Sequence, residues 1–260
     1  GAMRICCLIL LAGRAFCADG LYSNGTIVSM DARGRMFEAL GVRDGRIVAV
    51  GTRAAVSQSL RPDFEQTDLR GRTLLPGFYA AHDHFPSAGS VELYQVDLNS
   101  PPIGAILNMD QLIAALKRKA DATPAGEWVV GRGYDDTLLA ESRHPTRNDL
   151  DRVSTRHPVW IVHISGHLGA ANSRALEIAG LTKATQQPSG GRIRVDARTG
   201  EPNGVLEEAG SLVSRHIPGY TAEQRQAAIR KAQEGYLAQG VTTTVIAGAS
   251  AETLRDLDAA

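Results

Sequence analysis

The chain has 260 residues, of which 43% are hydrophobic and 22% are charged, and it contains 27 glycines and 11 prolines. This composition is typical of a packed α/β protein with many turns and excludes a disordered chain. Because 28 basic residues balance 28 acidic ones without a basic block, the charge pattern gives no indication of nucleic acid or an anionic membrane as a partner.

Residues 1–19 differ from the rest of the chain. Gly1-Ala2-Met3 resembles a tag-cleavage scar plus the initiator methionine, and the apolar run that follows, with small residues near Ala18, resembles a secretory signal peptide. Arg14 interrupts that run, so a leader without export function is the alternative, and location in the cytoplasm or outside it stays open. The three cysteines all lie within these residues, so no disulfide framework is expected, and no run of about 18 apolar residues predicts a membrane span.

Residues 20–73 are predicted to form a small β-module. Short β-prone stretches follow one another here, and Asp44-Gly45 between two of them is a strong hairpin signal. From residue 74 onward, strand-like and helix-like stretches alternate, which indicates βα units and a mainly parallel sheet.

Two later helices have clear ends. A capping box of Thr221 and Gln224 begins one helix and Gly240 ends it, before residues 241–248, which are predicted to form a strand buried on both faces. Asn172 caps a shorter helix that ends at Gly180 and follows a buried strand. Residues 190–204 are expected to form a hairpin and loop.

The stretch "LLPGFYAAHDHF", residues 74–85, is the strongest functional signal. On a strand, His82 and His84 point to one face and Asp83 to the other. Strand geometry places the two histidine Cα atoms about 6 to 7 Å apart, so both rings can reach one divalent ion at about 2.1 Å. At the carboxyl end of a barrel strand, such a pair would lie where βα-barrel enzymes carry out chemistry.

This stretch resembles the first barrel strand of the amidohydrolase superfamily, and the β-module before it resembles the small sandwich that accompanies that barrel. Further segments resemble, in order, the branch that contains N-substituted formamide deformylase: "GRGYDD", "RHPTRNDLD", "PVWIVHISGHLGAANSRALEIAG", "GGRIRVDARTGEPNGVLEE" and "GVTTTVIAG". The sequence departs from the family pattern Asp-Ala-His-x-His at Ala80, and Asp83 is an unusual middle residue, although neither is an expected metal ligand.

The resemblance implies a (β/α)8 TIM-type barrel with a small β-sandwich domain, of which only the first part of the barrel is present. Residues 74–260 would carry the first barrel strands and an inserted α/β segment at about 85–220. It also implies one or two divalent ions, with zinc the expected metal, and a proton-transferring aspartate late in the barrel, beyond this sequence. This portion alone is therefore expected to be inactive.

Three further residues are site candidates. Glu208 matches an acidic family position and is a candidate metal ligand, although adjacent acids also serve as helix-dipole partners. His167 and Asp136 are candidate substrate contacts; a structural histidine and a turn-forming aspartate are the alternatives. His163 and His167 are four residues apart, but Ser165-Gly166 indicates a loop. The remaining three histidines are expected on the surface: His144, His157 and His216.

The predicted function is metal-dependent hydrolysis of a C–N bond, in an amide or N-substituted formamide, by metal-activated water. The substrate would be a small molecule, and a homodimer is left open. A deaminase or an ester or ring hydrolase on the same barrel is one alternative, and a non-catalytic fragment is another. The sequence has no G-x-S-x-G elbow and no cysteine near a histidine, so it gives no support to serine or cysteine nucleophiles.

Overall fold

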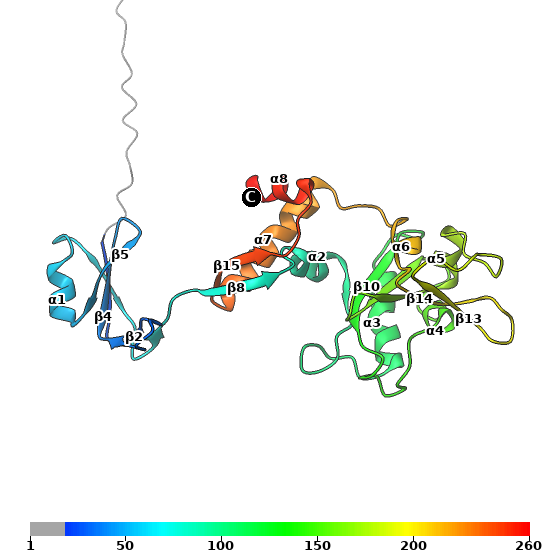
Figure 1. Cartoon of the computed structure of the whole chain (residues 1–260), viewed down its shortest axis with the longest axis horizontal. Helices are drawn as coiled ribbons and strands as arrows, with labels where there is room; N and C mark the ends of the chain where they lie inside the picture. The colour runs from blue at the N-terminus through cyan, green and yellow to red at the C-terminus, as the bar shows by residue number, and fades with distance from the viewer. Residues whose placement is uncertain (1–18) are drawn as a thin grey trace, which may run out of the picture. The chain divides into compact units, whose positions relative to one another are not determined.

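The computed structural model describes residues 19–260 (Figure 1). The leader predicted for residues 1–19 therefore lies, except for Asp19, outside the described residues. The chain divides into two compact units, one ending at Phe78 and the other running from Tyr79 to Ala260. Within the described part of the chain, no helix has both the length and the apolar character needed to cross a bilayer.

The first unit contains two small sheets, one ordered β5-β4-β1-β6 and the other β3-β2-β7. Its elements are β1 Gly20–Ser23, β2 Thr26–Val28, β3 Met36–Phe37, β4 Ala39–Arg43, β5 Arg46–Gly51, α1 Arg53–Gln58, β6 Glu65–Asp68 and β7 Thr73–Leu74. The predicted hairpin is confirmed, because Asp44 and Gly45, with φ of 51° and 73°, join β4 to β5 in antiparallel pairing. One hydrophobic cluster draws on both sheets, with Ile27 from β2 and Leu40 from β4, as expected for sheets packed face to face.

The second unit begins with a two-stranded sheet of β8, Phe78–Asp83, and β15, Val241–Ile246, which Figure 1 shows side by side in cyan and red. Three helices accompany it: α2 Ser87–Tyr94, α7 Ala222–Ala238 and α8 Ala251–Asp258. The capping box predicted at the start of α7 is confirmed, since Thr221 and Gln224 exchange their side-chain and backbone hydrogen bonds. Phe85, Ile229 and Ala232 form the buried centre of this region.

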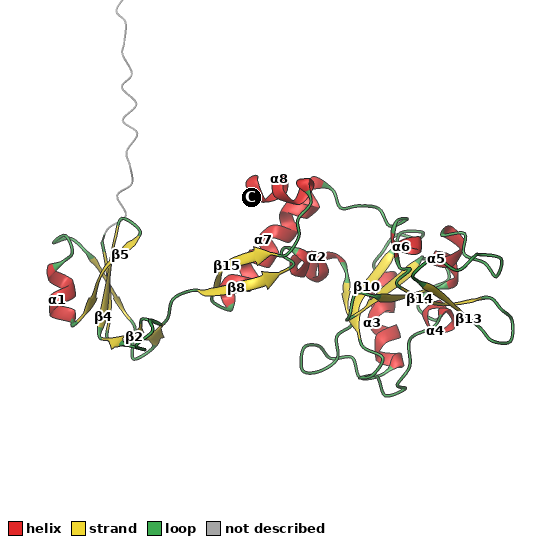
Figure 2. Cartoon of the chain, in the orientation of Figure 1, coloured by secondary structure: helices red, strands yellow, loops and turns green. Residues whose placement is uncertain are grey.

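The rest of this unit is built around a six-stranded sheet ordered β13-β14-β12-β11-β10-β9, with strands yellow and helices red in Figure 2. Its elements are β9 Val96–Asp97, α3 Met109–Asp121, β10 Val129–Tyr134, α4 Arg147–Asp151, β11 Val159–His163, β12 Leu168–Ala171, α5 Ser173–Ile178, β13 Arg192–Val195, β14 Pro202–Glu207 and α6 Ser211–Ser214. The predicted hairpin of β13 and β14 and the Asn172 cap of α5 are both confirmed.

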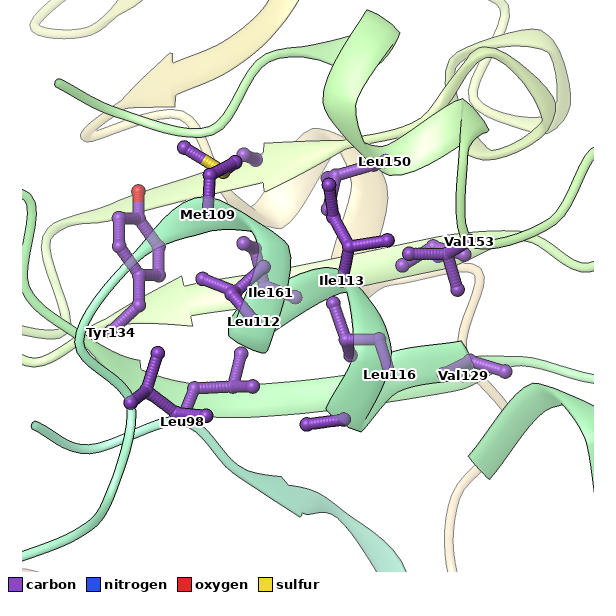
Figure 3. Packing of buried hydrophobic residues seen from close by; sticks show 14 of the residues in the cluster. Leu98, Met109, Leu112, Ile113, Leu116, Val129, Tyr134, Leu150, Val153 and Ile161 are labelled. Carbon is purple, nitrogen blue, oxygen red and sulfur yellow. The ribbon is translucent and has the colours of Figure 1, made fainter. Parts of the chain in front are cut away.

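The two faces of this sheet carry separate cores. Ile161 of β11 belongs to a cluster with Leu112 and Leu116 of α3, which Figure 3 shows packed against the strands. Trp160, its neighbour in β11, belongs instead to a cluster with Leu176 of α5. Because successive residues of a strand point to opposite faces, α3 and α5 lie on opposite sides of the sheet.

The expectation that residues 241–248 form a strand buried on both faces is wrong. β15 is a strand, but its residues are half-buried or exposed rather than covered on both faces, and the same holds for β8. The physical reason is that each of these strands pairs only with the other among the described strands. The α/β class is confirmed. Residues 19–260 contain no closed barrel, and the assignment of β8 and β15 to the first part of a TIM-type barrel stays a prediction.

Candidate functional site

His82 lies on β8 and His84 follows directly after the strand. Their ring centres are 5.4 Å apart and the ring planes meet at 81°, with both side chains exposed. Two imidazoles that bind one ion at about 2.1 Å with a tetrahedral angle have ring centres about 5 Å apart. The spacing of the two rings therefore fits a shared divalent ion without a large movement of the strand.

Asp83, between the two histidines, holds β8 against its neighbours. Its Oδ2 accepts a 2.7 Å hydrogen bond from the Thr244 hydroxyl of β15, and its Oδ1 accepts one from the His84 backbone N–H. Burial acts to raise the pKa of Asp83, but hydrogen bonds from Tyr236, Thr244 and His84 outweigh it and lower the pKa. Burial and the contact with Asp83 raise the pKa of Tyr236 to about 12. The unusual middle residue of the motif is thus a structural link between β8, β15 and α7.

The segment after His84 is fixed by packing. Phe85 is 7% exposed, and its ring meets that of Tyr236 edge to face at 5.5 Å. His84 and Phe85 also line a cavity of about 290 Å³, together with Arg225 and Asp256, which form an ion pair at 2.6 Å. Space for a small molecule therefore lies directly beside one member of the histidine pair.

A second group of polar side chains gathers at one edge of the six-stranded sheet. β9, β10 and β11 are parallel, so their carboxyl ends meet there, and β12 begins at the same edge because it is antiparallel to β11. Asp135 and Asp136 follow β10, and His163 ends β11. Ligands of open α/β sheets bind at this end of the strands.

Asp136 lies between two imidazoles at this edge. Its Oδ1 is 3.1 Å from Nε2 of His163 and 3.4 Å from Nδ1 of His144. Burial is the main cause that lowers the pKa of His144, against the opposing charge of Asp136. Asp135 accepts hydrogen bonds from the hydroxyl and the backbone N–H of Thr137. These hydrogen bonds, chiefly the one from the hydroxyl, lower the pKa of Asp135. Asp135 therefore shapes the turn after β10 as well as belonging to this polar group.

His167 and Glu208 are brought together. Nδ1 of His167 lies 2.9 Å from Oε1 of Glu208, and the Glu208 backbone N–H donates to the His167 carbonyl at 2.8 Å. Both side chains are exposed, and Glu208 has a φ of 50°, which is uncommon for a residue other than glycine. The predicted metal ligand and the predicted substrate contact therefore form one pair at the edge of the sheet.

Only one set of three ligating side chains within residues 19–260 comes within reach of a single ion, namely Asp135, Asp136 and His163. It includes Asp136, a predicted substrate contact, but not His82, His84 or Glu208. No role is predicted for His163 from the sequence. The rule that parallel strands end at one edge of a sheet, applied to the buried strands before Asp135 and His163, would have placed these residues together.

The expectation of surface histidines is right for His216, which is exposed, and wrong for the other two. His157 is 3% exposed, with Nδ1 2.8 Å from the Ser154 hydroxyl and Nε2 3.1 Å from the Thr123 carbonyl. His144 has a side chain 13% exposed and packs beside Tyr134. Both are drawn into the interior by partners that are distant in the chain or on another element.

Residues 65–260 match the model of the amidohydrolase family. The chain belongs to the amidohydrolase family. It is 34% identical over 250 residues to N-substituted formamide deformylase of Arthrobacter pascens, which covers 93% of this chain and 45% of the relative. It is 31% identical over 232 residues to Protein LONG AFTER FAR-RED 3 of Arabidopsis thaliana, covering 89% of this chain and 38% of the relative.

A solved structure is also similar to this amidohydrolase chain. An uncharacterized metal-dependent hydrolase from Pyrococcus horikoshii OT3 matches with a TM-score of 0.64 and 26% identity, over 93% of this chain and 45% of that one. The chain thus spans less than half the length of the relatives it matches. The likeness runs across both the β-module and the sheet-containing unit.

Proposed function

We propose that this amidohydrolase-family chain forms part of a metal-dependent hydrolase, which cleaves a C–N bond in a small amide or N-substituted formamide. The observation that carries the proposal is the pair of exposed imidazoles at the end of β8, with ring centres 5.4 Å apart. Family membership and the similarity to a metal-dependent hydrolase support hydrolytic chemistry. The formamide substrate class is supported by the relative that is named for that activity.

His82 and His84 would hold the ion, for which zinc suits two nitrogen donors. When bound, such an ion lowers the pKa of a water ligand toward about 7 and polarises the scissile carbonyl. Asp83 keeps both rings in position by anchoring the strand to Thr244, and it turns away from the face that the histidines share. The cavity beside His84 would receive the substrate, with the Arg225–Asp256 pair on its wall.

Two other predicted residues take roles in this proposal. His167 and Glu208 act as a pair whose mutual contact at 2.9 Å holds the imidazole toward the edge of the sheet. We propose this pair as a contact for the polar end of a substrate, since both side chains are exposed. Glu208 as a metal ligand stays a prediction, because its carboxylate is engaged with His167.

The metal assignment is tested by metal analysis after dialysis against Zn²⁺. We expect His82→Ala and His84→Ala each to weaken zinc binding at this site by at least about 100-fold, since two donors define it. His216→Ala, which removes an exposed histidine elsewhere, is the matched control and should retain wild-type zinc binding. If both site variants bound as many zinc ions per chain as wild type, and with the same affinities, His82 and His84 would not be the ligands.

The reaction class is tested separately. An N-substituted formamide plus water gives formate and an amine, and a matched formate ester gives formate and an alcohol. Release of amine that depends on His82 and His84 supports C–N hydrolysis. Both assays use a chain that also carries the late-barrel aspartate that the family resemblance implies. In that chain, release of alcohol alone would favour the ester-hydrolase alternative, and the absence of both products with zinc bound would favour the non-catalytic one.

A further inference from the structure

The polar group at the edge of the six-stranded sheet has the geometry of a cation site. Nε2 of His163 lies 3.1 Å from Oδ1 of Asp136 and 4.0 Å from Oδ1 of Asp135. The donor atoms of a tetrahedral site with bonds of about 2.1 Å are about 3.4 Å apart. The two distances bracket that value, so shifts of less than about 1 Å would bring all three residues to one ion.

His163 supplies a second, independent observation. Its Nε2 is buried and has no hydrogen-bond partner of good geometry, although the Asp136 carboxylate is within 3.1 Å. Nε2 therefore faces two carboxylates without a well-formed hydrogen bond, and a buried polar group of this kind calls for a specific explanation. An ion between the imidazole and the carboxylates would satisfy all three groups at once.

We propose that Asp135, Asp136 and His163 bind a divalent transition-metal ion, in a site additional to the His82–His84 pair. One nitrogen donor with two carboxylates suits Zn²⁺ or Mn²⁺ better than Ca²⁺ or Mg²⁺, which prefer oxygen donors alone. The site is built on two parallel strands of the six-stranded sheet, whereas the histidine pair is built on β8. This assignment gives Asp136 an ion as its partner in place of the predicted substrate contact.

The surrounding residues provide the second layer that metal ligands need. Ser165 lies against the far nitrogen of the His163 ring, with its hydroxyl 2.9 Å and its backbone N–H 3.1 Å from Nδ1. These two groups fix the orientation of the ring with Nε2 facing Asp136. An ion on Nε2 requires the ring proton on Nδ1, which then donates to the Ser165 hydroxyl oxygen while the hydrogen bond from the Ser165 backbone N–H is lost. His144, whose Nδ1 is 3.4 Å from Asp136, is placed to orient that carboxylate.

The test removes the other metal site first. Chain carrying His82→Ala and His84→Ala is treated with chelator, dialysed against Zn²⁺ and analysed for bound metal. We expect about one zinc ion per chain to remain. Adding Asp136→Asn or His163→Gln should weaken this binding by at least about 100-fold, and adding Ser165→Ala by about 10- to 100-fold, as for residues that support a ligand. Asp110→Asn, an exposed aspartate on α3, is the matched control and should change nothing.

Two results would overturn the proposal: no zinc bound to the chain that lacks His82 and His84, or zinc binding that Asp136→Asn and His163→Gln leave unchanged. Should either variant fail to fold, as judged by circular dichroism, Mn²⁺ added to the folded His82→Ala, His84→Ala chain gives the answer. Paramagnetic broadening of the NMR signals of His163 and Ser165 before others is expected. Their persistence at saturating Mn²⁺ would rule the site out. Loss of zinc from the histidine pair alone bears on the proposed function and not on this site.

Discussion

Asp149 is expected to be a main source of acid sensitivity in the unit that carries the six-stranded sheet. This residue is 7% exposed at the start of α4, and its carboxylate accepts hydrogen bonds of 2.7 and 2.9 Å from the Arg143 guanidinium. It also accepts 2.8 and 2.7 Å hydrogen bonds from the backbone N–H and the hydroxyl of Thr146. Burial acts to raise the pKa, but these bonds outweigh it and lower the pKa of Asp149 to about 2.

The sign and size of the effect follow from linkage. An aspartate has a pKa of about 3.9 in an unfolded chain, so its interactions stabilise the fold fully above that pH and are lost as the pH falls through about 2. The difference between these two pKa values of Asp149 corresponds to at most about 2.5 kcal/mol of folding free energy. Asp149→Asn removes the charge and turns an amide donor toward Arg143, so we expect a loss of about 2 to 4 kcal/mol at pH 7.

The assay is urea unfolding followed by tryptophan fluorescence. Trp128 and Trp160, the two tryptophans of the chain, both pack in one core of this sheet, so the signal reports on this unit. The difference between wild type and Asp149→Asn should shrink as the pH falls from about 4 to about 2. Asp110→Asn, in an exposed ion pair, should change stability by less than about 1 kcal/mol. Equal stabilities at pH 7, or a difference that acid leaves unchanged, would refute the reasoning.

Two further predictions concern residues whose surroundings are equally specific. Asn172→Asp should lower the free energy of unfolding by about 3 kcal/mol or more, as measured by urea unfolding. The buried Asn172 amide donates to the Ser154 and His157 carbonyls, and a carboxylate in its place would face two acceptors. An unfolding midpoint close to that of wild type would contradict this prediction. Gly89→Ala would place a Cβ 1.9 Å from the Ala228 carbonyl oxygen and push α2 away from α7. We expect this to lower the free energy of unfolding by about 1–3 kcal/mol and to weaken zinc binding by His84. Gly235→Ala, which adds a Cβ in open space on α7, should instead raise the free energy of unfolding by about 0.5–1 kcal/mol. If Gly235→Ala unfolded at a lower urea concentration than Gly89→Ala, crowding between α2 and α7 would not be the cause of the destabilisation.

The features predicted well from sequence are those that a few neighbouring residues determine. Asp44-Gly45 adopts the positive φ angles of its turn whatever lies around it, and Thr221 and Gln224 satisfy each other across one helical turn. Asn172 was recognised as a cap for the same reason. The ring centres of His82 and His84 lie 5.4 Å apart, and their role as metal ligands stays a prediction.

The features that could not be predicted depend on partners far along the chain. Residues 241–246 are rich in β-branched side chains, which fit a covered strand and an uncovered one equally well, so their composition could not reveal that β15 pairs with β8 alone. His144 lies in a polar stretch and is expected on the surface, yet its ring packs beside Tyr134 of β10 and His163 of β11. The contact of Glu208 with His167 joins residues 41 positions apart.

The separation of cores in the sheet-containing unit has a consequence for how such an enzyme can diversify. The strand that carries the histidine pair is anchored by a cluster around Phe85 and Ile229, whereas the side chains at the edge of the large sheet rest on two other clusters. Substitutions in the loops after β10, β11 and β14 can therefore alter the side chains at that edge while the strand of the histidine pair keeps its own support. Evolution could change the sheet edge through those loops and leave the proposed metal-binding histidine pair intact.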